Sequence, residues 1–254
     1  MIVEYLRPST IEEALGLISR VEPRTYAMGG GTVLNRPSEE RFAVVDLQAL
    51  GLNQMERSGN ILRVGATTTL QALAGNVDIQ LALREAVQRE TSYHLRLAAS
   101  VAGTIVAADG RSRLAGCLLA MDATLEVESK AAGKEQVRLG EVMAVSDELL
   151  RGKLIVAVNI PLHVRLAFEC ISRTAGDEPI VYAVVVRWPS GRTRLVLGGT
   201  GKAPMMAMDG SEASGVETAA RSAYSQAGDE WASAEYRQEM AGLLATRCLG
   251  QLNE

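Results

Sequence analysis

The sequence has few residues of the types that usually build metal centres. Of its 254 residues, three are cysteine and two are histidine. Cys117, Cys170 and Cys248 lie far apart and form no CxxC pair, which excludes a four-thiolate iron–sulfur cluster or a zinc-ribbon site made by this chain alone. We therefore expect no metal in this chain, and we expect its cysteines to be buried thiols that pack like small apolar side chains.

A basic surface and a long apolar run are missing as well. Lys and Arg number 26 against 30 Asp and Glu, giving a net charge of −4, which argues against nucleic acid as a partner. The longest strongly apolar run, IVYAVVV (180–186), is too short to span a bilayer. The first residues lack the pattern of a secretion signal. We expect a globular cytoplasmic protein without a membrane span.

The first part of the chain alternates helix and strand patterns. Thr10 and Glu13 have the spacing of a capping box ahead of an apolar helical face. A further helix is predicted to start near Thr68 or Thr69, and others are predicted over 78–90, 93–98 and 114–123. The predicted strands are RTYAM (24–28), FAVVDL (42–47), NILRVG (60–65), TLEVES (124–129), EQVRL (135–139) and LIVAVNIP (154–161), with 124–139 forming a hairpin.

The last third of the chain has a different pattern. Three apolar segments predict antiparallel strands over 165–173, 180–188 and 192–201, and PSG (189–191) predicts the turn between the last two. Two helices follow, over 212–226 and 234–249. Strands followed by helices are typical of a small α+β domain, so we place a domain boundary near residue 164.

Two glycine-bearing segments, AMGGGTVLN (27–35) and SVAGTIVAADG (100–110), follow predicted elements of the first domain. Glycines expose successive main-chain N–H groups, and such concave turns bind phosphate oxygens. Neither segment matches the Rossmann or Walker pattern, so the residues alone leave a tight turn and a phosphate site both open. Arg111 and Arg113, just beyond the second segment, fit either a solvated turn or a contact with an anion or a subunit.

The order of these motifs resembles the FAD-binding medium subunit of molybdenum hydroxylases, the family of xanthine dehydrogenase and aerobic carbon monoxide dehydrogenase flavoproteins. MGGGTVL (28–34) stands where the family has AGGTDL, and VVDLQAL (44–50) follows as its VDL segment does. The resemblance continues through LRVGATTTLQAL (62–73), the run 94–127, AFECISRTAGDEPIVYAVVV (167–186), LVLGGTGKAPM (195–205) and YRQEMAGLLATRCL (236–249).

The resemblance implies an α+β fold in two domains. Residues 1–164 would form a two-lobed FAD-binding domain of the PCMH type, with lobes of about 1–52 and 53–164. Residues 165–254 would form a C-terminal domain like that of carbon monoxide dehydrogenase flavoproteins, with a three-stranded antiparallel sheet and helices.

The resemblance also implies a set of FAD-binding residues. By position, the first pyrophosphate loop would contain Ala27, Met28, Gly29, Gly30, Gly31, Thr32 and Val33. The second would contain Ser100, Gly103 and Thr104. Arg113 stands where the family has an acid near the flavin, and Ile155 where an apolar residue meets the isoalloxazine. The flavin would do the redox chemistry, so no catalytic acid or base is assigned.

In that family, electrons come from a molybdenum-binding large subunit through a [2Fe–2S] small subunit and leave through FAD to NAD⁺ or another acceptor. The chain would therefore be an oxidoreductase subunit of the xanthine or carbon monoxide dehydrogenase type, with molybdopterin and the clusters in its partners. Val33, Ala102, Thr104 and Arg113 depart from the family pattern. The alternative is a flavin-free relative that keeps the fold and the subunit interfaces.

Overall fold

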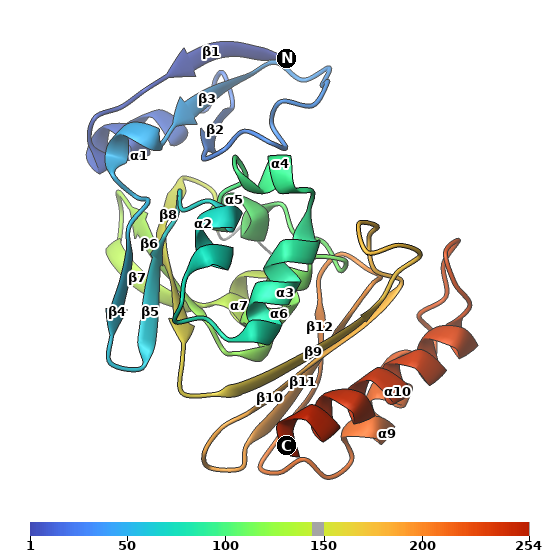
Figure 1. The fold of residues 1–254 in the computed structure, drawn as a ribbon. Coiled ribbons are helices and arrows are strands. Elements are labelled where there is room, and N and C mark those ends of the chain that lie inside the picture. The colour runs from blue at the N-terminus through green and yellow to red at the C-terminus, as the bar shows by residue number, and fades with distance from the viewer. Residues whose placement is uncertain (144–149, 254) are drawn as a thin grey trace. The chain divides into compact units, whose positions relative to one another are not determined.

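The computed structural model describes residues 1–143 and 150–253 and confirms the expected α+β class (Figure 1). The chain packs into two compact units. Unit 1 comprises Met1–Leu73, Tyr93–Ala107 and Thr124–Ile160, and unit 2 comprises Ala74–Ser92, Ala108–Ala123 and Pro161–Glu254. The boundary near 164 and the two lobes remain predictions. No helix of the described residues is long and apolar enough to cross a membrane.

The first sheet of unit 1 is parallel, with the order β1-β3-β2. Its strands are β1 (Ile2–Leu6), β2 (Thr25–Met28) and β3 (Phe42–Asp46). Helix α1 (Ile11–Ile18) begins as the capping box predicts, because the amide of Glu13 donates to Oγ1 of Thr10 at 3.2 Å. The buried face of α1 packs against the sheet.

The second sheet of unit 1 has five strands in the order β4-β5-β8-β6-β7. They are β4 (Met55–Ser58), β5 (Ile61–Gly65), β6 (Thr124–Ser129), β7 (Gly133–Arg138) and β8 (Lys153–Pro161). Strands β6 and β7 form the predicted hairpin. The short helices of this part are η1 (Gln48–Leu50), α2 (Leu70–Gly75), α4 (Tyr93–Arg96), α5 (Val101–Val106) and α7 (Leu139–Met143).

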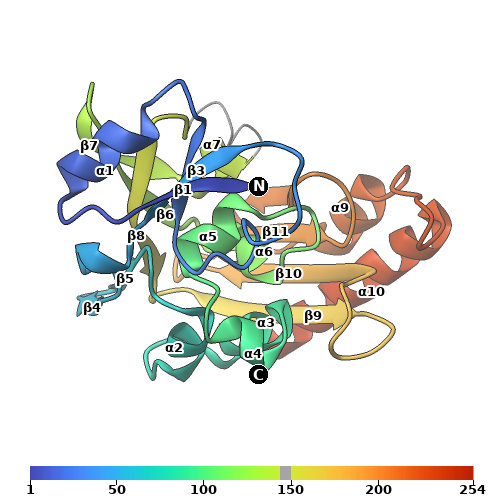
Figure 2. The same ribbon diagram turned by 90° about the horizontal axis from the view of Figure 1, so that it is seen from above.

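Unit 2 is built on an antiparallel sheet in the order β12-β11-β10-β9. Its strands are β9 (Arg165–Ile171), β10 (Val181–Arg187), β11 (Thr193–Gly198) and β12 (Met205–Gly210). Figures 1 and 2 show α9 (Val216–Ala223) and α10 (Ala234–Asn253) on one face of this sheet. Helices α3 (Leu81–Glu90) and α6 (Arg113–Ala120) cover the other face.

The prediction of three strands in the C-terminal sheet is wrong by one strand. The segment MMAMDG forms a fourth strand, β12, which pairs with β11. It lies at a sheet edge and half of the Met206 side chain is exposed, so it lacks the apolar alternation that marks a half-buried strand. The turn between β10 and β11 is confirmed, and Gly191 adopts a positive φ of 92° there.

The prediction that the cysteines are buried thiols holds for two of the three. Cys117 and Cys248 are completely buried, and burial raises the pKa of both thiols. Cys170 on β9 is only half-buried. Among the described residues no group of three His, Cys, Asp or Glu side chains could hold a metal ion.

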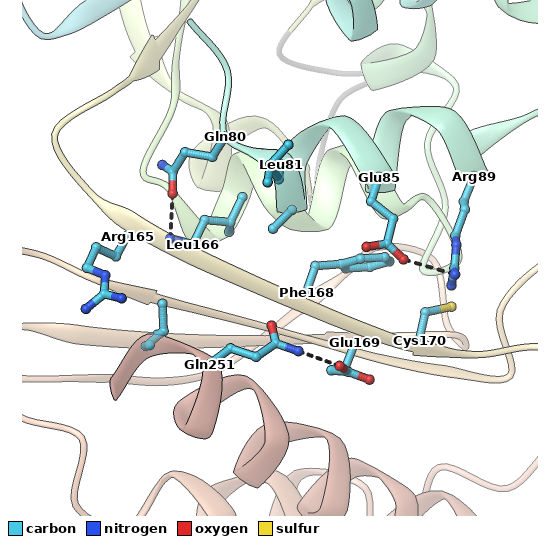
Figure 3. A pocket seen from close by; sticks show the side chains of 12 residues that line it. Gln80, Leu81, Glu85, Arg89, Arg165, Leu166, Phe168, Glu169, Cys170 and Gln251 are labelled. Atoms are coloured by element: carbon cyan, nitrogen blue, oxygen red, sulfur yellow. Dashed lines mark hydrogen bonds and ion pairs between the residues drawn. The ribbon is translucent and has the colours of Figure 1, made fainter. Parts of the chain in front are cut away.

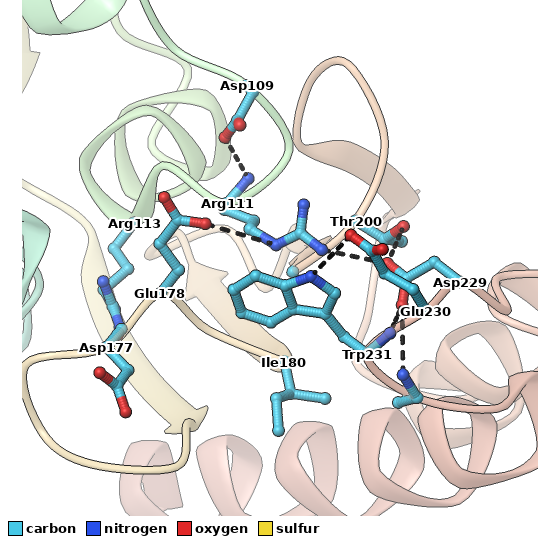
Figure 4. Close-up of polar contacts among 12 residues, drawn as sticks. Asp109, Arg111, Arg113, Asp177, Glu178, Ile180, Thr200, Asp229, Glu230 and Trp231 are labelled. Atoms are coloured by element: carbon cyan, nitrogen blue, oxygen red, sulfur yellow. Dashed lines mark hydrogen bonds and ion pairs between the residues drawn. The ribbon is translucent and has the colours of Figure 1, made fainter.

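A completely buried arginine ties the strands of unit 2 to its last helix. Arg237 at the start of α10 donates to the carbonyl of Gly199 at 2.9 Å, to that of Ile180, and to Oδ1 of Asp229 at 2.6 Å. Asp229 also accepts from Arg111, whose guanidinium lies 4.3 Å from the ring of Trp231 (Figure 4). Burial alone would raise the pKa of Asp229, but the hydrogen bonds from Arg237 and nearby amides lower it to about 2.

Replacing this arginine is expected to destabilise unit 2 strongly. Arg237→Met leaves two carbonyls and a carboxylate without their buried donor, a loss of about 3–5 kcal/mol in the free energy of unfolding. Unfolding in urea, monitored by circular dichroism, measures this loss. The matched control is Arg221→Met on α9, whose exposed pair with Glu217 contributes about 1 kcal/mol or less. Equal losses in the two variants would contradict the role of Arg237.

The stability of unit 2 in acid should depend on Asp209. Hydrogen bonds from Arg192 and Arg194 lower the pKa of Asp209 from 3.8 to about 2. Because the folded-state pKa is below the unfolded value, this carboxylate stabilises the fold above pH 3.8 and loses that contribution as the pH falls towards 2. Asp209→Asn should lower the free energy of unfolding by about 1–2 kcal/mol at neutral pH and by little at pH 2, which urea unfolding at each pH measures. If the difference in the free energy of unfolding between the parent and Asp209→Asn were the same at every pH, the prediction would be contradicted.

Candidate cofactor site

The glycine-rich segment begins where β2 ends, as the sequence predicts. The amide of Leu47 donates to the carbonyl of Met28 at 3.0 Å, and the side-chain amide of Gln48 donates to the carbonyl of Gly29 at 3.1 Å. Gln48 is itself fixed by buried Asp46, whose Oδ1 accepts its main-chain N–H at 2.9 Å. Strand β3 and η1 therefore hold the carbonyl side of the turn.

The two predicted loops pack directly against each other within unit 1. A Cβ at Gly30 would lie 1.7 Å from the carbonyl oxygen of Ala98, and a Cβ at Gly29 would lie 2.2 Å from Oγ of Ser100. Real Cβ atoms do not approach other atoms so closely, so both positions require glycine. Gly31 has a different reason, because its φ of 67° is in the left-handed region.

Main-chain donors of the first loop are left free by this packing. In the chain as described, residues 1–143 and 150–253, the amides of Gly29, Gly30, Gly31 and Thr32 donate no hydrogen bond to a protein acceptor. Successive free N–H groups around a left-handed residue form a concave anion-binding turn. The residues present therefore fit a phosphate group at this turn.

The second segment differs from the expected loop, because its first part is helix α5. Ser100 is the N-cap and accepts the amide of Gly103 at 3.2 Å through Oγ. The amide of Val101 donates to the main-chain carbonyl of Thr68 at 2.8 Å. The amide of Ala102 donates to the main-chain carbonyl of Ala66 at 3.2 Å. Thr104 donates both its amide and its hydroxyl to the carbonyl of Ser100, each at 2.9 Å.

The expectation of free amides in this second segment is therefore wrong for 101–104. The first two of these amides join α5 to the turn before α2, and the other two bond to Ser100. The remaining polar groups for a ligand are the donor proton of the Ser100 hydroxyl and the acceptor lone pairs of Thr104. One buried hydroxyl beside them was missed from the sequence: Oγ1 of Thr68 has no hydrogen-bond partner among the described residues. The TTT run gave no sign of which threonine would be left unpaired.

The electrostatics of the site depend on dipoles and not on charged side chains. Segments 27–35 and 98–107 contain no Asp, Glu, Lys or Arg. Asp46, behind the turn, accepts a short hydrogen bond from Tyr5, and this hydrogen bond raises the pKa of the tyrosine. Within these two segments, an anion at the turn would meet neutral N–H and O–H donors only.

The other expected site residues occupy distinct places. Ala27 is exposed and Met28 half-buried, both on β2, and Val33 follows the glycines with 43% of its side chain exposed. Ile155 is buried on β8 opposite Val127. Its neighbours along β8, Leu154 and Val156, belong to the core around α1, so Ile155 lies on the other face of the sheet.

Arg113 belongs to unit 2, unlike the glycine turn. It is 2% exposed and donates to the carbonyls of Arg89, at 2.6 Å, and of Asp177. Arg111 is also largely covered and pairs with Asp229 at 3.0 Å (Figure 4). The interpretation of both arginines as a solvated turn is therefore wrong, because each guanidinium is used within unit 2.

Comparison with known proteins adds independent information on the family. Residues 1–163 match the family described as "FAD binding domain in molybdopterin dehydrogenase". The chain is 28% identical over 253 residues to the uncharacterized protein YgfM of Escherichia coli (strain K12), covering 96% of this chain and 94% of that protein. It is 26% identical over 280 residues to the carbon monoxide dehydrogenase medium chain of Afipia carboxidovorans, covering 97% and 95% of the two chains.

The fold agrees with solved structures along almost the whole chain. The reconstituted carbon monoxide dehydrogenase from Oligotropha carboxidovorans matches with a TM-score of 0.82 and 23% identity, over 97% of this chain and 96% of the other. Quinoline 2-oxidoreductase from Pseudomonas putida 86 matches with a TM-score of 0.78 and 21% identity, over 98% and 95%. The family match over residues 1–163 confirms the resemblance seen in the motifs, and the chain belongs to the family of FAD-binding domains of molybdopterin dehydrogenases.

Proposed function

We propose that the chain binds FAD, with the diphosphate at the turn Gly29–Thr32. The observation that carries the proposal is the set of free main-chain amides in this turn, beside the hydroxyls of Ser100 and Thr68. Hydrogen bonds to charged acceptors are each worth about 1.5–3 kcal/mol. Ala27, Met28, Val33, Gly103 and Thr104 would line the same turn, and Ile155 and Arg113 are proposed nearer the flavin ring.

The redox role follows from the family. When bound, FAD supplies chemistry that accepts electrons singly or in pairs. The chain's own residues bind and orient the dinucleotide: the amides of Gly30 and Gly31 meet phosphate oxygens, and Gln48 holds the turn from behind. We infer that the chain is the electron-transfer subunit of a molybdenum-containing hydroxylase or dehydrogenase in the cytoplasm.

The proposed partners are a molybdenum-binding large subunit and a [2Fe–2S] small subunit, with electrons leaving to NAD⁺ or another acceptor. The relatives support an assembly, since one similar protein is a carbon monoxide dehydrogenase medium chain and another is subunit alpha of the 6-hydroxypseudooxynicotine dehydrogenase complex of Paenarthrobacter nicotinovorans. Molybdopterin and the clusters would be in those partner chains.

Two observations favour the alternative, a flavin-free relative that keeps the fold. The amides of 101–104 are all used within the protein, and Val33 places an exposed apolar side chain beside the turn. Only the first loop would then contribute main-chain donors, which halves the N–H groups available to a diphosphate.

Titration with flavins decides between the two. The purified chain is titrated with FAD, FMN and riboflavin, and binding is followed by flavin fluorescence and visible absorption. FMN lacks the adenosine monophosphate half of FAD, and riboflavin lacks both phosphates. If the turn holds the diphosphate, affinity should fall by about tenfold or more at each of these two steps. A chain that stays colourless with excess FAD supports the flavin-free alternative, and equal affinity for all three compounds would contradict the proposed location of the diphosphate.

A single methyl group should disturb the site. Gly30→Ala places a Cβ against the carbonyl of Ala98, which forces the two loops apart and should weaken FAD binding by about tenfold or more. The matched control is Gly75→Ala at the end of α2, where a Cβ meets nothing within 4 Å. Circular dichroism checks that both variants fold, and parental FAD affinity in a folded Gly30→Ala chain would count against the site.

A further inference from the structure

Strand β9 is an edge of the sheet in unit 2, and part of its open side is covered by one side chain. Oε1 of Gln80 accepts from the amide of Leu166 at 2.9 Å, and its Nε2 donates to the carbonyl of Val164 at 2.7 Å. Figure 3 shows the contact with Leu166. A side-chain amide that donates and accepts in this way takes the place of one peptide group of a neighbouring strand.

Beyond Gln80 the edge is unpaired. Phe168 and Cys170 follow Leu166 at the alternating positions of β9, so their N–H and C=O groups also point away from β10. In the portion of the chain that the structure describes, no donor or acceptor pairs with these main-chain groups. An open strand edge is a template for an extended segment of another chain.

The edge lies along a cavity of about 700 Å³ between α3 and the end of α10 (Figure 3). Leu81 at the rim of the cavity is 77% exposed. The buried side chains of Phe168 and Leu252 also line the cavity. Most charged groups around it are satisfied locally, since Glu85 pairs with Arg89 at 3.0 Å and Glu169 accepts from Gln251 at 2.6 Å. Apart from Arg165, the free polar groups of the described residues here belong to the main chain, which suits a peptide.

One charge in the cavity lacks a counterpart. Arg165 is exposed and stands directly opposite Arg187 in the β9–β10 register, while Arg187 donates to Asn253. Within residues 1–143 and 150–253, Arg165 has no ion pair. Like charges at opposed positions are unfavourable, so a carboxylate beside Arg165 would be stabilising.

We propose that an extended segment of another subunit of the complex binds here as an added strand on β9. Its main chain hydrogen-bonds with Phe168 and Cys170, an apolar residue packs on Leu81, and an acidic residue meets Arg165. A second copy of β9 is a poorer match for Arg165, because the one carboxylate of that strand, Glu169, already accepts from Gln251 at 2.6 Å. The inference rests on the proposed role as a subunit.

Hydrogen exchange tests the added strand. The chain is compared alone and in the complex formed by co-expression with its large and small subunits, with residue-resolved mass spectrometry. The amides of Phe168 and Cys170 should exchange about tenfold or more slowly in the complex. Those of Ala167 and Glu169, which pair with β10, are internal references. Unchanged exchange at Phe168 and Cys170 in an intact complex would overturn the proposal.

A proline at an outward-facing position provides the matched variant. Cys170→Pro removes the thiol and an unpaired N–H, which an edge strand tolerates, and it blocks an added strand. Cys170→Ala removes the thiol alone and leaves the N–H in place. Affinity for the partner subunits should fall by about tenfold or more in the proline variant and stay unchanged in the alanine variant. Unchanged affinity in both would refute the inference. If Cys170→Pro does not fold, Leu81→Asp at the exposed rim replaces it.

Flavin content separates this inference from the proposed function. A complex that assembles with protected β9 amides but contains no flavin refutes the FAD proposal and leaves the docking site intact. A flavin-loaded complex with unprotected β9 amides refutes the docking site and leaves the FAD proposal intact.

Discussion

The contact between the glycine turn and the segment before α5 is the constraint on which the candidate site depends. Two stretches of chain about seventy residues apart meet closely, because Gly29 has no Cβ to collide with the Ser100 side chain and Gly30 has none to collide with the carbonyl of Ala98. Two of the three glycines thus serve chain packing, and the third allows a left-handed bend. Within residues 1–143 and 150–253, no protein acceptor pairs with the amides of this turn.

The same contact gives the two loops unequal roles. The amides at the start of α5 are used to anchor the helix to Ala66, Thr68 and Ser100, so α5 supplies rigidity and hydroxyl groups. The first loop supplies the N–H donors. With no charged residue in either segment, the site would hold a diphosphate by oriented dipoles, which need no desolvation of a charged side chain.

Unit 2 depends on buried charge in a different way. Arg237, Arg113 and Arg194 are each at most 5% exposed, and each donates to at least one main-chain carbonyl. Arg194 also donates to the carboxylate of Asp209. These carbonyls would otherwise be buried without donors, which costs more than a hydrogen bond returns. Arginine can serve several carbonyls at once because its donors are spread over a rigid planar group.

The sequence by itself determined the local elements and the family. The capping box at Thr10 starts a helix, the hairpin at 124–139 forms, and β2 stops at the glycines, because these signals act over a few residues. Tertiary structure decided which amides are free, why Gly30 must be glycine, that Arg113 is buried, that MMAMDG becomes an edge strand, and that β9 is open. Each of these depends on partners supplied from distant parts of the chain, and hydrogen-bond satisfaction and steric exclusion between distant segments leave no periodic pattern in a single sequence.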